Sequence, residues 1–224
     1  MSILSIQSPS VSDLASAVGD IRKSARHTLL LFDRGLKDLQ DSFLQSYILD
    51  QTSRGDLVVS IRGERTQSES DLFSELRLTV PFAESMGSNF NAMEDVFSYQ
   101  ALSQNRLKRT HWLWSNAHVL YQANRKAFDL TFEVLADCAR QASKGFAPAG
   151  GETIPPRADW SPQVVLVLVT GIWEIMKDVA SDPNSIVNRL PTRWKAFFPD
   201  LSTNFVTLRV VGVGRDRTDD GSVG

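Results

Sequence analysis

Short apolar runs alternate with amphipathic stretches between residues 56 and 142, and this alternation constrains the fold more than any other feature. DLVVSIRG (56–63) has the length and composition of a strand, and a second such run begins at His111. The stretches between and after these runs have helical spacing. Because adjacent parallel strands need a crossover, usually a helix, the pattern predicts an α/β fold with a small parallel sheet.

The chain before this region also carries regular patterns. Residues 10–25 have the apolar spacing of a helix, 27–32 form a short apolar run typical of a strand, and 36–49 return to helical spacing. The segment TSRGD (52–56) is a turn. It indicates a boundary between an N-terminal extension, residues 1–54, and a core domain, residues 55–214.

The C-terminal third admits two assignments. Residues 143–162 are rich in Pro and Gly and are expected to form a loop. In the favoured assignment, 164–171 and 204–214 are both strands, with helices between about 172 and 198. In the other, a helix begins at Ser161-Pro162 and runs to Ala180, which leaves 204–214 as the closing strand. Residues 215–224 are polar and are predicted to be a disordered tail.

Composition excludes several classes of protein. The 224 residues are 42% apolar and 22% charged with a net charge of −2, which indicates a soluble globular protein without general attraction to nucleic acid. The single cysteine, Cys138, cannot form an internal disulfide. The N-terminus has no signal-peptide pattern, and no apolar run is long enough to span a bilayer. We therefore expect a cytoplasmic protein that does not bind membranes.

Catalytic and metal-binding motifs are not found in the sequence. His27, His111 and His118 lie beside apolar stretches without Cys or carboxylates at ligand spacing, so they are expected to be core or surface residues. No P-loop, dinucleotide-binding glycine motif or nucleophile elbow is present. The basic run 105–111 is interpreted as a solvated connection. The sequence predicts neither an enzyme nor a cofactor or metal site.

One segment does suggest a function: PFAESMGSNFNAMEDVFSY, residues 81–99. Gly87 permits a turn, and Ser88 or Asn89 can cap the helix that follows. Helical spacing then separates a buried face from a polar one. The expected buried residues are Phe90, Met93 and Phe97, and the expected polar ones are Asn91, Glu94 and Asp95. The result is a compact acidic, amide-bearing loop and helix.

This segment resembles the recognition loop and second helix of the barstar family of ribonuclease inhibitors. The matching positions are Pro81, Met86, Gly87, Asn89, Asn91, Ala92, Met93, Glu94 and Asp95. The flanks agree, because 56–63 fits the family's opening strand, 68–80 its first helix, and 111–141 its second strand, connecting turn and long helix. The chain departs from the family where Asn91 replaces an aspartate, Glu94 a tryptophan and Ser85 a tyrosine.

The resemblance implies a three-stranded parallel sheet packed by helices, with residues 1–54 as a helical extension and an insertion around 143–200. It also implies an immunity protein or antitoxin that blocks the basic active site of a ribonuclease toxin, without contacting nucleic acid directly. Glu94 and Asp95 would then occupy phosphate-like positions. The implied partner-binding residues are Glu84, Ser85, Met86, Gly87, Asn89, Asn91, Glu94, Asp95 and Asp137. In the alternative interpretation, the core is only a scaffold, and the extensions at 1–54 and 143–200 bind another protein.

Overall fold

The computed structural model describes residues 3–23, 27–33, 35–81, 83–103, 109–144, 155, 163–171 and 205–212. They form one six-stranded sheet in which every pairing of neighbouring strands is parallel. The spatial order is β1-β6-β2-β5-β4-β3. The strands are β1 (Ile3–Gln7), β2 (His27–Phe32), β3 (Leu57–Arg62), β4 (Thr110–Ser115), β5 (Gln163–Thr170) and β6 (Phe205–Val211).

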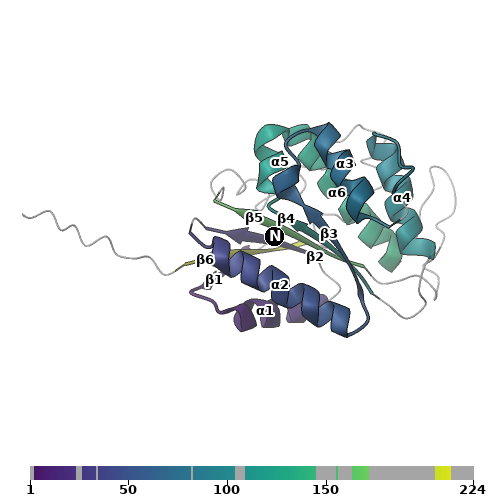
Figure 1. Ribbon diagram of the computed structural model, residues 1–224. Helices are drawn as coiled ribbons and strands as arrows, with labels where there is room; N and C mark the ends of the chain where they lie inside the picture. The colour runs from purple at the N-terminus through teal and green to yellow at the C-terminus, as the bar shows by residue number, and fades with distance from the viewer. Residues whose placement is uncertain are drawn as a thin grey trace, which may run out of the picture.

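Helices cover both faces of this sheet (Figure 1). Helices α1 (Val11–Lys23) and α2 (Lys37–Ser53) lie on one face. The other face carries α3 (Glu69–Thr79), α4 (Phe90–Ser103), α5 (His118–Ala123) and α6 (Arg125–Lys144). A 3₁₀ turn, η1 (Gly63–Arg65), follows β3. The α/β class with a parallel sheet is confirmed, but the prediction of three strands is wrong.

The segment expected to be a helical extension contributes strands as well as helices. Residues 1–54 supply β1 and β2, and β2 lies between β5 and β6 in the interior of the sheet. In the C-terminal third, both 163–170 and 205–211 are strands, as the favoured assignment stated. The helices expected between 172 and 198 and the tail at 215–224 fall outside the described residues.

Two hydrophobic clusters fill the spaces above and below the sheet. In β5, alternate residues face opposite sides: Val165 and Val167 join the cluster under α3–α6, whereas Leu166 and Leu168 join the one under α1 and α2. Continuous burial on both faces explains why this strand is an unbroken apolar run. Trp112 and Trp114, two residues apart on β4, share the α3–α6 side.

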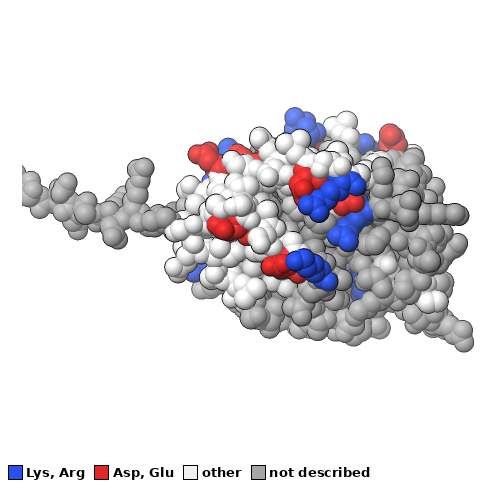
Figure 2. Space-filling model, turned by 90° about the horizontal axis from the view of Figure 1, so that it is seen from below, with Lys and Arg blue, Asp and Glu red and all other residues white. Residues whose placement is uncertain are grey.

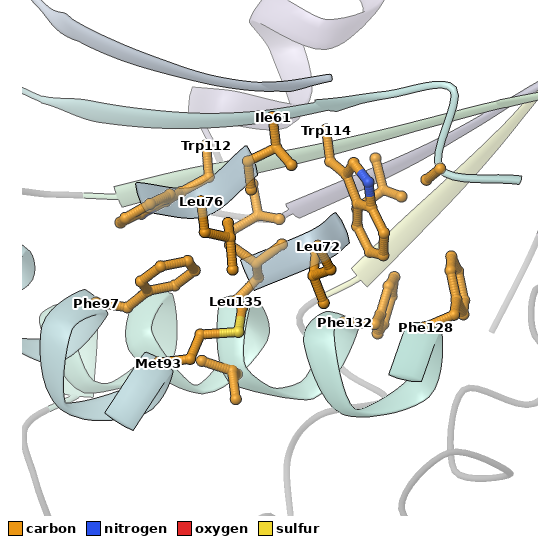
Figure 3. Close-up of a cluster of buried hydrophobic side chains, with 14 of the residues drawn as sticks. Ile61, Leu72, Leu76, Met93, Phe97, Trp112, Trp114, Phe128, Phe132 and Leu135 are labelled. Atoms are coloured by element: carbon orange, nitrogen blue, oxygen red, sulfur yellow. The ribbon is translucent and has the colours of Figure 1, made fainter. Parts of the chain in front are cut away.

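Aromatic stacking fixes α4 and α6 onto β4 (Figure 3). The ring of Phe97, from α4, stacks on Trp112 with centroids 4.3 Å apart. Phe128, from α6, packs on Trp114 with centroids 5.1 Å apart. Each aromatic pair contributes about 0.5–1.5 kcal/mol beyond the free energy of burying its surface. These two contacts therefore hold α4 and α6 against β4.

A buried polar chain fastens α2 to the other face of the sheet. The Tyr47 hydroxyl lies 2.7 Å from His111 Nδ1, and His111 Nε2 lies 2.9 Å from a carboxylate oxygen of Asp56. His111 is fully buried, so of the two positions expected for the histidines, core or surface, it takes the core one. The chain joins α2, β4 and the residue before β3, and it ties the N-terminal segment to the rest of the sheet.

Figure 2 views the face that carries α1 and α2. Among the described residues of these helices, cations sit beside anions: Lys23 pairs with Asp20 at 2.8 Å and Arg54 with Asp50 at 3.0 Å. The described charged residues of these helices therefore form no basic surface of the kind that binds phosphate backbones. In the described part of the chain, no helix is both long and apolar enough to cross a membrane.

Candidate partner-binding site

The loop between α3 and α4 is held from below by one arginine. Arg77, in the last turn of α3, donates from Nε to the carbonyl oxygen of Met86 at 3.0 Å and from Nη2 to the hydroxyl of Ser88. Met86 is 5% exposed and packs in the core. The loop is therefore anchored by a guanidinium and by the buried side chains of Ala83 and Met86, while Glu84, Ser85 and residues 87–89 are exposed.

Asn89 is the cap of α4. Its Oδ1 accepts from the backbone N–H of Ala92 at 2.8 Å, which satisfies one of the free donors at the helix start. The role expected for Gly87 needs correction, because its backbone does not lie in the left-handed region. A Cβ at position 87 would instead approach Asn89 Nδ2 at 3.2 Å, so the small residue leaves room for the cap.

We expect Asn89→Ala to destabilise the protein by about 1 kcal/mol, because the side chain caps α4. Asn91→Ala is the matched control, because this substitution removes the same side chain from an exposed position of the same helix. Its effect should stay within about 0.5 kcal/mol. Urea unfolding of both variants measures the difference, and equal effects would show that the Asn89 hydrogen bond contributes nothing to stability.

The exposed part of the loop and helix is polar and acidic. Asn91 and Asp95 lie four residues apart on α4, so their side chains are neighbours on its outer surface. The candidate residues in exposed positions are Glu84, Ser85, Gly87, Asn89, Asn91 and Asp95. Of the three residues expected on the buried face of α4, Met93 and Phe97 are fully buried and Phe90 is partly buried.

Glu94 is coupled electrostatically to α6. Its side chain is half-buried, and the charges that act on it are those of Asp137, Asp95 and Arg140. Burial raises the pKa of Glu94 to about 7; the charges of Asp137 and Asp95 add to this, and Arg140 opposes it. At neutral pH this carboxyl is therefore partly protonated, unlike an ordinary surface glutamate.

Asp137, on α6, is buried. It is 3% exposed and accepts hydrogen bonds from Arg140 Nε at 2.8 Å and Gln141 Nε2 at 2.6 Å. Burial raises the pKa of Asp137, although Arg140 and Gln141 work against this. Asp137 acts on the rest of the site electrostatically, through Glu94. Its role is therefore to favour the protonated form of Glu94.

The sequence reasoning missed Glu133, one helical turn before Asp137 on α6. Glu133 is 6% exposed, and burial, with help from the charge of Asp129, raises its pKa to about 8. Asp129 accepts a hydrogen bond from Arg125 Nε at 2.8 Å. The spacing of Asp129, Glu133 and Asp137, each four residues apart, was the available signal that one face of α6 is acidic.

The other titratable groups on the α3–α6 side do not extend the site. Cys138 is fully buried, with its Sγ 3.8 Å from the hydroxyl of Ser98, and burial raises the pKa of its thiol. His118 Nδ1 accepts from the backbone N–H of Thr170 at 3.3 Å, and burial lowers its pKa. Among the described residues no group of His, Cys, Asp and Glu has the arrangement of a metal site.

The middle of the chain matches a known protein family. Residues 57–152 match the family model of barstar, the barnase inhibitor. The family resemblance is thereby confirmed for this segment, which we call the barstar-like segment. It contains β3, α3, α4, β4, α5 and α6, including the loop and helix described above. Strands β1, β2, β5 and β6 lie outside it.

Solved structures resemble the chain over most of its length. It is similar to the Aeropyrum pernix ORC2 protein, solved in ADPNP-ADP complexes, with 7% identity and a TM-score of 0.50; the match covers 90% of this chain and 46% of that one. A Drosophila ORC bound to AT-rich DNA and Cdc6 matches with 12% identity and a TM-score of 0.44, over 90% of this chain and 28% of that one. At 7% identity the first likeness shows the fold alone, and this chain spans about half of that protein's length. No curated protein matches.

Proposed function

We propose that this chain is a protein inhibitor, an immunity protein or antitoxin, which binds and blocks the basic active site of a ribonuclease toxin. The observation that carries the proposal is the match of residues 57–152 to the barstar family, together with a rigid loop and helix that expose acidic and amide groups. A ribonuclease site is lined with cations that bind phosphates, and carboxylates held in place of phosphates satisfy them. Inhibition of this kind needs no catalytic step in the inhibitor.

Each part of the loop and helix has a role in this proposal. Asp95 and Glu84 are exposed and supply negative charge, and Asn91 offers a neutral hydrogen bond beside Asp95. Arg77 and Asn89 hold the loop and the start of α4 in one geometry before the partner arrives. Preorganisation of this kind lowers the entropy lost on binding.

Glu94 makes the proposed binding dependent on pH. A cation of the partner near this carboxyl favours its charged form, so complex formation releases a proton at neutral pH. Because the pKa of Glu94 in the free chain is about 7, affinity should rise as the pH increases from 6 to 8. The Glu94→Gln variant, which cannot titrate, should lose this dependence.

The decisive experiment compares variants that each lack two carboxyl groups. Tagged wild type, Glu94→Ala/Asp95→Ala and the control Asp38→Ala/Glu69→Ala are used to capture proteins from native lysate, and the captured basic nuclease is assayed on RNA. The control removes two exposed carboxylates from α2 and α3. We expect wild type and control to inhibit equally and the site variant to bind on the order of 100-fold more weakly, as for an interface charge pair. Equal inhibition by all three would overturn the proposal.

A second candidate function is a protein-interaction module that binds through other surfaces. It is favoured by the departures from the family at Asn91 and Glu94. Truncation does not provide a clean test, because removing residues 1–54 would take β1 and β2 out of the sheet. Instead, a partner that binds wild type and the Glu94→Ala/Asp95→Ala variant equally would support this function.

A further inference from the structure

An ion pair joins α3 to the end of β3. Glu75 lies on α3 and is 2% exposed, and Arg62 is the last residue of β3. The guanidinium of Arg62 donates to one carboxylate oxygen of Glu75 from Nε at 2.6 Å and to the other from Nη2 at 3.0 Å. The backbone N–H of Arg62 donates to the same carboxylate at 3.3 Å. These bonds fasten one point of α3 to one point of the sheet.

The ion pair and the anchor of the partner-binding loop lie on opposite sides of α3. Glu75 and Arg77 are two residues apart, which is about 200° around the axis of an α-helix. On the side of Arg77, the guanidinium holds the carbonyl oxygen of Met86 and the hydroxyl of Ser88. Helix α3 therefore links the end of β3 to the loop between α3 and α4.

The apolar contacts of α3 are less directional than this ion pair. Leu72 and Leu76 belong to the apolar cluster drawn in Figure 3, and the ring of Phe73 packs edge-on against Phe90 with centroids 5.3 Å apart. Hydrophobic attraction holds the helix on the sheet without selecting one rotation about its axis. A bidentate pair of guanidinium and carboxylate is satisfied in one geometry only. The pair therefore sets the direction in which Arg77 leaves the helix.

Stability alone gives no reason for a charged pair at this position. The cost of desolvating a buried ion pair offsets much of its attraction, and apolar residues of similar volume often stabilise a protein as well. What a charged pair adds is orientation. We propose that Arg62 and Glu75 are positioning residues, which orient α3 and, through Arg77, hold the partner-binding loop in the geometry that receives the partner. The inference rests on the proposed function for the use of that ordered loop.

Two substitutions separate the parts of this ion pair. Glu75→Gln keeps the shape of the side chain and removes its charge, whereas Arg62→Lys keeps the charge and removes the planar fork. Arg62 is more exposed than Glu75, so Arg62→Lys also provides a milder variant if Glu75→Gln fails to fold. The control is Asp33→Asn, which breaks the ion pair of Asp33 with Arg209 at 3.2 Å, outside the barstar-like segment.

Amide hydrogen exchange of the chain alone tests whether the pair orders the loop. The N–H of Met86 bonds to the carbonyl oxygen of Ala83 at 2.9 Å, and the N–H of Ala92 bonds to Asn89 Oδ1 at 2.8 Å, so both amides report on the loop. Both should exchange about tenfold or more faster in Glu75→Gln and Arg62→Lys than in wild type. Asp33→Asn should leave both rates unchanged, and the amides of β5 serve as the reference for global unfolding.

Affinity for the nuclease captured by wild type tests whether this order serves binding. Glu75 is buried and cannot touch a partner, so a change at this position reaches the partner only through the loop. Glu75→Gln should bind that nuclease about tenfold more weakly than wild type, because a disordered loop loses entropy on binding. Asp33→Asn should bind as wild type does.

Three outcomes would overturn the inference. The first is exchange at Met86 and Ala92 that matches wild type while circular dichroism shows the variants folded. The second is exchange that accelerates equally at the amides of β5, which would show that the pair contributes only to global stability. The third is a captured nuclease that binds Glu75→Gln as tightly as wild type. If no nuclease is captured, the proposed function fails, whereas the exchange rates still decide whether the ion pair orders the loop.

Discussion

Substitution of Gly63 by alanine is expected to destabilise this protein by about 3 kcal/mol, at the upper end of the range for overpacking. Gly63 follows β3 directly, and a Cβ there would lie 2.2 Å from the carbonyl oxygen of Ser115 and 2.5 Å from that of Asn116. These are backbone atoms at the end of β4, so no side-chain rotation can relieve the clash. The ends of two paired strands would have to separate.

The clash would spread because Asn116 is itself constrained. It adopts a left-handed backbone with φ of 47°, a region that Asn tolerates better than most residues. Its side chain accepts a hydrogen bond from Gln40 at 3.2 Å and donates one to Glu64 at 3.3 Å. Displacing Asn116 would weaken both bonds and the contact of α2 with the ends of β4 and β5.

Gly19→Ala is the matched control for this prediction. Gly19 lies inside α1, and a Cβ there meets nothing within 4 Å. Alanine is a better helix former than glycine, so this variant should gain about 0.5–1 kcal/mol. Guanidinium unfolding of the two variants should therefore give effects of opposite sign, and a Gly63→Ala protein as stable as wild type would show that the two strand ends separate without cost.

The local elements could be predicted from sequence because their apolar patterns are strong. The helix at 69–79 begins where Ser68 caps it, with a hydrogen bond of 3.1 Å from Asp71 N–H, and α4 buries Met93 and Phe97 as their spacing indicated. The strand at 27–32 was also expected. Among the described strands, β1 alone was not predicted, since two of the five residues of ILSIQ are polar and the run is too short to show a period.

The assembly of these elements could not be predicted, because it depends on pairings between distant residues. The sheet has six strands instead of three because β2 pairs with β5 on one side and with β6 on the other, and His27 lies opposite Phe205. Likewise, the spacing along α4 put Glu94 on a polar face but could not show that Asp137 of α6 lies beside it. Charges on two helices meet only when packing brings them together.

The second large effect is expected at Glu133 and depends on pH. Its carboxyl has a pKa of about 8 in the folded protein, against 4.5 ordinarily, because it is buried and near Asp129. Between these values the folded state keeps a proton that the unfolded state releases, so raising the pH favours unfolding. The stability that depends on the proton of Glu133 is fully present below about pH 4.5 and is lost as the pH rises to about 8.

Glu133→Gln should therefore stabilise the protein in alkaline solution and leave it unchanged in acid. The amide has nearly the same shape and no charge to bury, so the gain over wild type should grow from about zero at pH 4.5 to about 2–4 kcal/mol at pH 8.5. The exposed residue Glu69 provides the control, and Glu69→Gln should follow wild type at every pH. Urea unfolding across this pH range measures all three proteins. A gain in stability that is the same at every pH would show that packing of the amide, and not the proton on Glu133, is responsible. Only the titration of a buried carboxyl makes the stability difference between variant and wild type grow from pH 4.5 to pH 8.5.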